Sequence, residues 1–118
     1  MRVALIFGML LTLTLAACSS ASGSSNASGN ELNVTMSEFK FQPSSFVMAA
    51  GQSITLRVKN AGTVDHDFAI EKLGVSLTMK PGATGAQQIG PFAPGTYDVI
   101  CSIAGHKEAG MVARLTVK

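Results

Sequence analysis

The chain of 118 residues has little charge, only two cysteines and only two histidines. Nine lysines and arginines nearly balance seven aspartates and glutamates, and no basic run alternates with aromatic residues. This composition argues against nucleic-acid binding, which requires clustered positive charge. The sequence also lacks a helical hydrophobic period of useful length, and its length fits one domain. We therefore expect a single domain without long helices.

The N-terminus is predicted to be a targeting segment. Arg2 precedes an almost wholly apolar stretch over residues 3–15, which is too short for a comfortable transmembrane span. The ending Leu-Ala-Ala-Cys at Cys18 resembles a bacterial lipobox. That resemblance implies a lipoprotein signal peptide over residues 1–17 and diacylglycerol on the Cys18 sulfur. Two or three acyl chains would hold the protein on a membrane, since each buried CH₂ contributes about 0.8 kcal/mol. Ordinary secretion, with Cys18 lost or free, is the alternative.

A flexible linker is expected to follow the lipidated cysteine. Residues 19–30 contain only serine, glycine, alanine and asparagine, which cannot bury enough apolar surface to fold. The chain is therefore divided into a signal peptide over 1–17, a lipidated cysteine and linker over 18–30, and a folded domain over 31–118. A disulfide between Cys18 and Cys101 is the alternative use of the two cysteines. Each of them has a better separate explanation, in the tether and in a metal-binding loop.

The folded domain is predicted to consist of short strands. From residue 31 onward, apolar and polar residues alternate over short segments separated by turn signals. We expect strands at residues 32–36, 53–59, 66–71, 87–89, 97–101 and 111–117, with residues 73–85 less regular. The core is expected to include Phe39, Phe41, Phe46 and Met48. Short strands at this spacing predict an antiparallel sandwich or barrel.

Three residues near the C-terminus indicate a metal site. Cys101, His106 and Met111 follow one another at intervals of five residues and are soft or borderline ligands, which suit copper better than a hard cation. The other histidine is His66. Two histidines, one cysteine and a weak axial methionine are the ligands of blue-copper sites, so we predict one mononuclear copper bound by these four residues. The alternatives are a free buried thiol for Cys101, an ordinary core or surface histidine for His66, and packing at the start of a strand for Met111.

The same region resembles a known family. The pattern G-x-Y-x-x-x-C-S-x-x-G-H-x-x-x-G-M at residues 95–111 is similar to the C-terminal copper loop of the cupredoxins, which include plastocyanin, azurin and auracyanin. Upstream, E-F-K-F-x-P, A-G-Q, V-K-N-A-G and H-D-F extend the resemblance to residues 34–118. It implies an all-β Greek-key sandwich or barrel of seven to eight strands around a type 1 copper that cycles between Cu(I) and Cu(II). Asp67 stands where many cupredoxins carry asparagine, so the tie between the two ligand loops is expected to be charged or made differently.

These observations predict a membrane-tethered blue-copper electron carrier in the bacterial cell envelope, on its extracytoplasmic face. It is expected to be a monomer that exchanges one electron with redox protein partners and binds no nucleic acid. A periplasmic copper-binding or delivery protein is the alternative, although the chain lacks additional methionine or histidine tracts. An enzyme is not expected, because one domain with one ligand set lacks the second copper site that nitrite reduction or phenol oxidation uses. A metal-free adhesion domain would leave the four ligands unexplained.

Overall fold

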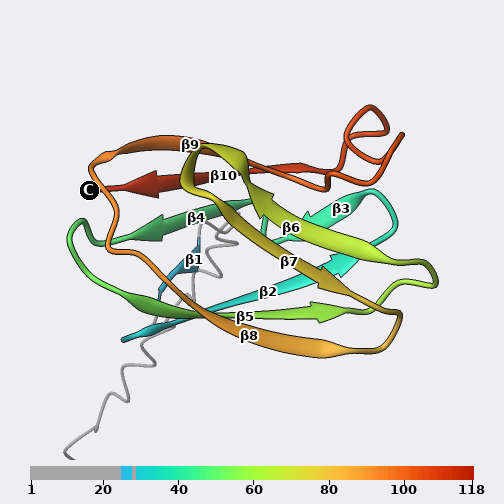
Figure 1. Cartoon of the computed structure of the whole chain (residues 1–118), viewed down its shortest axis with the longest axis horizontal. Coiled ribbons are helices and arrows are strands. Elements are labelled where there is room, and N and C mark those ends of the chain that lie inside the picture. The colour runs from blue at the N-terminus through green and yellow to red at the C-terminus, as the bar shows by residue number, and fades with distance from the viewer. Residues whose placement is uncertain (1–24, 28) are drawn as a thin grey trace, which may run out of the picture.

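The computed structural model describes residues 25–27 and 29–118. Over these residues the chain forms ten strands and one short 3₁₀ helix, η1 (Figure 1). Their bounds are β1 (Ser25–Asn26), β2 (Glu31–Ser37), β3 (Lys40–Gln42), β4 (Ser45–Met48), β5 (Ile54–Asn60), β6 (His66–Ile70), η1 (Glu71–Leu73), β7 (Val75–Met79), β8 (Thr84–Ile89), β9 (Gly95–Ile100) and β10 (Val112–Val117). Within this part of the chain, no helix is long and apolar enough to cross a bilayer. The predicted signal peptide over 1–17, Cys18 and most of the linker lie outside the described residues.

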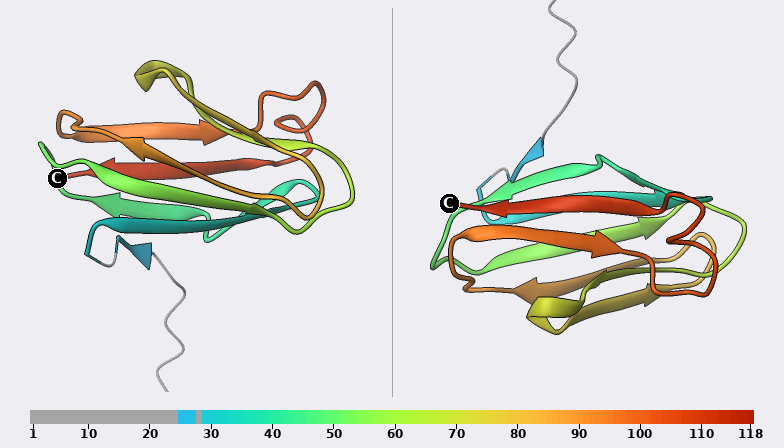
Figure 2. Two further views of the ribbon diagram at one scale, coloured as in Figure 1. Left: turned by 60° about the horizontal axis from the view of Figure 1, so that its bottom comes forward. Right: turned by 90° about the horizontal axis from the view of Figure 1, so that it is seen from above.

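The strands form two sheets that pack face to face (Figures 1 and 2). One sheet has the order β1-β4-β10-β9-β6-β7 and the other has the order β3-β2-β5-β8. The predicted all-β Greek-key sandwich is thus confirmed. The described strands exceed the expected seven to eight because β1 is a two-residue strand, and because residues 40–48 are divided between the two sheets as β3 and β4.

The expectation of purely antiparallel sheets is wrong at three pairs. The pairs β1 with β4, β4 with β10 and β2 with β5 are parallel, whereas the other pairs are antiparallel. The physical reason is connectivity: the chain passes repeatedly from one sheet to the other, as between β1 and β2, between β3 and β4 and between β4 and β5. Strands distant in sequence therefore become neighbours that run in the same direction.

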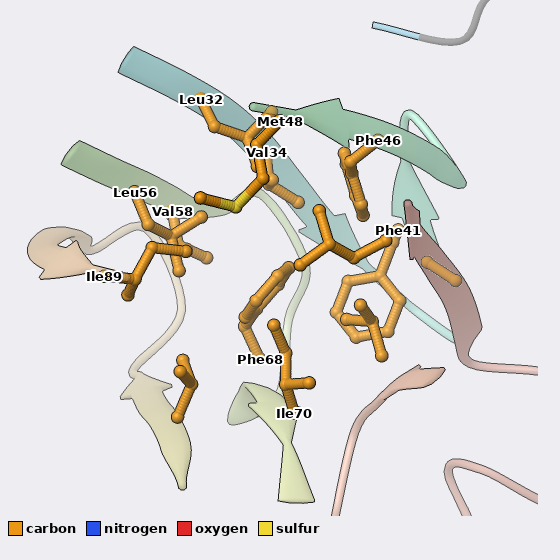
Figure 3. Packing of buried hydrophobic residues seen from close by; sticks show 14 of the residues in the cluster. Leu32, Val34, Phe41, Phe46, Met48, Leu56, Val58, Phe68, Ile70 and Ile89 are labelled. Carbon is orange, nitrogen blue, oxygen red and sulfur yellow. The ribbon is translucent and has the colours of Figure 1, made fainter. Parts of the chain in front are cut away.

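Alternation of apolar residues fixes which face of each strand is buried. In β2, β5 and β10 every second side chain is buried and the intervening ones are half-buried or exposed. Figure 3 shows side chains from both sheets meeting in one layer, where the Phe68 ring lies 5.8 Å from Phe41 and 6.0 Å from Phe46 between centroids. Full burial of such a side chain contributes roughly 1.5–3 kcal/mol, so the aromatic cluster is a major part of the core.

The predicted core is confirmed for Phe41, Phe46 and Met48, which are all at most 4% exposed, but is wrong for Phe39. Phe39 lies in the turn between β2 and β3 with φ 59°, a left-handed conformation that is uncommon for a residue with a side chain. Its ring is 46% exposed. A turn residue leaves the strand alternation, so the period of the neighbouring strands does not predict its burial.

The fold brings three chain segments to one end of the sandwich. His66 is the first residue of β6, Cys101 directly follows β9, and Met111 directly precedes β10. In Figures 1 and 2 the loop between β9 and β10 lies at the end opposite the C-terminus, beside the start of β6 and the turn between β2 and β3. The predicted ligands are therefore gathered where these segments meet.

Candidate metal centre

The loop over residues 101–111 is closed at its base by backbone pairing. Val112 pairs with Ile100, the amide of Cys101 donates to the Met111 carbonyl at 3.2 Å, and the amide of Met111 donates to the His106 carbonyl at 3.0 Å. Gly105 and Gly110 have φ values of 85° and 103°, which glycine adopts without steric cost. Glycine at these two positions therefore allows the loop to turn sharply between the ligands.

Three donor atoms converge at the mouth of this loop. Nδ1 of His66 lies 3.1 Å from Nδ1 of His106, which lies 3.4 Å from Sγ of Cys101, and the ligand atoms of all three residues lie within 4.8 Å of one another. Donors that share one metal ion must lie about 3–4 Å apart, because metal bonds to nitrogen and sulfur are about 2.0–2.3 Å long. The donor set and its spacing therefore fit a small, soft or borderline ion such as copper.

Burial differs among these residues in a way that bears on their chemistry. His66 and Cys101 are fully buried, whereas His106 is partly exposed at the end of the molecule. Burial lowers the pKa of the His66 imidazole, and the neighbouring His106 ring lowers it further. Burial also raises the pKa of the Cys101 thiol. A metal that binds the thiolate must therefore displace a proton from Cys101, and His66 presents a neutral ring.

Met111 is placed at the end of the same loop. Its side chain is fully buried and belongs to the hydrophobic core, and its backbone contacts both Cys101 and His106. The structure thus brings the fourth predicted ligand next to two of the other three, and its axial role stays a prediction.

Asp67 ties the two ligand-bearing segments together. Its amide donates to Sγ of Cys101 at 3.4 Å, its Oδ1 accepts from the Ser102 amide at 2.6 Å, and its Oδ2 accepts from the Ser102 hydroxyl. The side chain is only 4% exposed. The sequence left open how the two ligand loops are tied together at Asp67. In the structure, the carboxylate of Asp67 makes this tie.

Sequence reasoning missed two residues that shape the His66 segment. Asn60 is fully buried and its side chain bonds to three backbone groups. Glu38 accepts hydrogen bonds from the amide and the hydroxyl of Thr63, and the amide holds the pKa of Glu38 down to about 2. The sequence offered a signal for each residue: a glutamate before a Phe-x-Phe segment, and an asparagine two positions before a glycine. Neither signal names the hydrogen-bond partners, because these come from other strands and loops.

The surface beside His106 is uncharged where Phe39 and residues 103–105 form it, whereas the exposed Lys107 and Glu108 follow His106 in the chain. Phe39 packs against the His106 ring edge-to-face, with centroids 5.4 Å apart and an interplanar angle of 86°. Ala104 and Gly105 are exposed beside it, and Ile103 is partly buried. Phe39, which the sequence wrongly predicted to be in the core, thus forms part of the wall of the site.

The chain belongs to the cupredoxin-like domain family, whose model matches residues 6–113. It is similar to the copper-resistant cuproprotein CopI of Rubrivivax gelatinosus, with 25% identity over 74% of this chain and 66% of that protein. The chain thus spans just under two thirds of the length of this curated relative.

Solved structures share the fold, among them two auracyanins. A dithionite-reduced auracyanin from Roseiflexus castenholzii matches with a TM-score of 0.68 and 20% identity, over 81% of this chain and 99% of that chain. Auracyanin A of Chloroflexus aurantiacus, described as a "blue" copper protein, matches with a TM-score of 0.60 and 19% identity, over 75% of this chain and 99% of that chain. At this identity the likeness establishes the fold, and the role of this chain has to be argued from its own residues.

Proposed function

We propose that the protein is a blue-copper electron carrier with one type 1 copper, which supplies a Cu(II)/Cu(I) couple when bound. The observation that carries this proposal is the convergence of His66, Cys101 and His106 within 4.8 Å at one end of a rigid sandwich. The thiolate and the two neutral imidazoles would hold the ion, and Met111 would act as a weak axial ligand.

The protein around the site supports fast electron exchange. The backbone bonds of the loop and the contact between Asp67 and Ser102 hold the donors in place, so little needs to move when the charge of the site changes. Burial of Cys101 and His66 keeps water away from the donors. The partly exposed His106 ring offers the path to a partner, and the uncharged surface that Phe39, Ala104 and Gly105 form beside it suits a weak, short-lived encounter.

The proposed place of action is the extracytoplasmic face of a bacterial membrane, with redox proteins as partners. This part rests on the predicted signal peptide, lipidated Cys18 and linker. A domain held by acyl chains on a tether of about 20 Å mean reach would exchange electrons with partners near the membrane surface.

Copper binding for delivery is the second candidate, and the name of the cuproprotein relative favours it. The same donors would serve that role if copper exchanged readily. Slow copper exchange together with fast electron exchange would support the carrier, whereas fast copper exchange with an acceptor protein would support delivery.

An absorbance scan of the purified full-length protein after addition of Cu(II) tests the site. An intense thiolate-to-copper band in the visible region is expected from the wild type and should be lost in Cys101→Ser, because the band requires the thiolate. Cys18→Ser is the matched control and should keep the band. A band that persists in Cys101→Ser would overturn the assignment, and His66→Ala should regain a band when imidazole is added.

A further inference from the structure

The proposed copper site uses only one of the two ring nitrogens of His66. Nδ1 faces His106, whereas Nε2 is buried and has no hydrogen-bond partner within normal distance among the described residues. A neutral imidazole that binds a metal through Nδ1 carries its proton on Nε2. A buried N–H is costly to leave without an acceptor, so an acceptor is expected close to this atom.

Glu38 places a carboxylate beside this nitrogen. Its Oε1 lies 3.8 Å from Nε2 of His66, less than 1 Å beyond an ordinary hydrogen bond. The same oxygen accepts hydrogen bonds from the amide of Thr63 at 2.5 Å and from the Thr63 hydroxyl at 3.1 Å. Glu38 therefore approaches His66 from a fixed direction although its side chain is 42% exposed.

The absence of a side chain at Gly62 makes this approach possible. A Cβ at this position would lie 2.5 Å from Oε1 of Glu38 and 3.0 Å from Nε2 of His66. Gly62 is not among the glycines with positive φ, so its backbone conformation does not require glycine. The space that it leaves open is the space between the carboxylate and the imidazole.

We propose that Glu38 is a positioning residue for His66: it accepts the Nε2 proton, fixes the orientation of the ring and favours Cu(II) over Cu(I) through its negative charge. This inference rests on the proposed copper site. Carboxylates that bind the second nitrogen of a ligating histidine orient the ring and raise its basicity, and their removal typically weakens metal binding by about 10–100-fold. The alternative is a purely structural role, in which Glu38 only closes the loop through its hydrogen bonds to Thr63.

Two substitutions separate these roles. Glu38→Gln keeps an acceptor for Thr63 but removes the charge, whereas Gly62→Ala keeps the charge but inserts a methyl group between the carboxylate and His66. Glu31→Gln is the control, because Glu31 lies at the opposite end of β2, paired with Arg57 at 3.1 Å. The copper-loaded full-length protein is compared by Cu(II) and Cu(I) affinity, by reduction potential and by the NMR signal of the His66 Nε2 proton in the Cu(I) form.

Both Glu38→Gln and Gly62→Ala should lose Cu(II) affinity about 10–100-fold, with less change for Cu(I). Each tenfold difference between the two ions raises the potential by about 59 mV. The Nε2 proton should exchange slowly with solvent in the wild type and faster in Gly62→Ala, and Glu31→Gln should match the wild type. If Glu38 only closes the loop through Thr63, the variants should lose stability but keep the wild-type copper affinities and reduction potential.

Wild-type affinities and potential in both variants would overturn the role of Glu38. If Gly62→Ala does not fold, Glu38→Gln and the wild-type proton signal still decide, because rapid exchange of that proton in the wild type would also contradict the inference. A wild-type protein without the visible band would instead refute the proposed function. The two failures are therefore distinguishable.

Discussion

Replacing Asn60 with alanine is expected to lower the free energy of unfolding of the metal-free protein by about 3 kcal/mol. Nδ2 of Asn60 donates to the carbonyls of Val64 at 2.8 Å and Met79 at 2.9 Å, and Oδ1 accepts from the Gly62 amide at 2.9 Å. A hydrogen bond contributes about 0.5–1.5 kcal/mol net, so three of them give about 3 kcal/mol. Because Asn60 is fully buried, water does not readily replace the lost partner.

Asn60→Asp is the sharper test of the same contacts. Aspartate has nearly the same shape and keeps the acceptor for Gly62, but it replaces the two donors with an oxygen that faces two carbonyls. A buried carboxylate without a donor is costlier than a missing side chain, so Asn60→Asp should be less stable than Asn60→Ala at neutral pH. Burial raises the pKa of such a carboxyl above its unfolded value of about 3.9, so part of the deficit should be recovered as the pH falls toward that value.

Urea denaturation of the metal-free variants measures these differences. The exposed Asn33 on β2 supplies a control, and Asn33→Ala should remain within about 0.5 kcal/mol of the wild type. The reasoning would be refuted by an Asn60→Ala variant as stable as this control. It would also be refuted by an Asn60→Asp variant that is more stable than Asn60→Ala at neutral pH.

Three further predictions concern the ligand Met111, the neighbouring residue Asp67 and the membrane anchor at Cys18. Met111→Leu should raise the reduction potential and Met111→Gln should lower it, each by about 59 mV per tenfold change in relative affinity; unchanged voltammetry would mean that Met111 only packs. Asp67→Asn keeps an acceptor for the Ser102 amide but removes a charge beside Cys101, so the potential should rise while the visible band stays; a lower potential would contradict this. Cys18→Ser should move the protein from the membrane fraction to the soluble fraction, and an unchanged distribution would count against lipidation.

The sequence by itself determined the fold class and the local part of the site. Alternating apolar residues specify strands and their buried faces, because side chains in a strand point to opposite sides in turn. The spacing of Cys101, His106 and Met111 places three candidate ligands on one short loop, so their proximity follows from chain connectivity alone.

Tertiary structure decided what depends on contacts between distant segments. It divided residues 40–48 between two sheets, formed β7 within a stretch that the sequence left irregular, and moved Phe39 from the expected core to the wall of the site. It also brought His66 to the loop and Glu38 to His66. Hydrophobic alternation reports only which face of a strand is buried, so these contacts cannot be derived from it. They depend on strand pairing and sheet crossings, which join residues that are separated by 25 to 40 positions in the sequence.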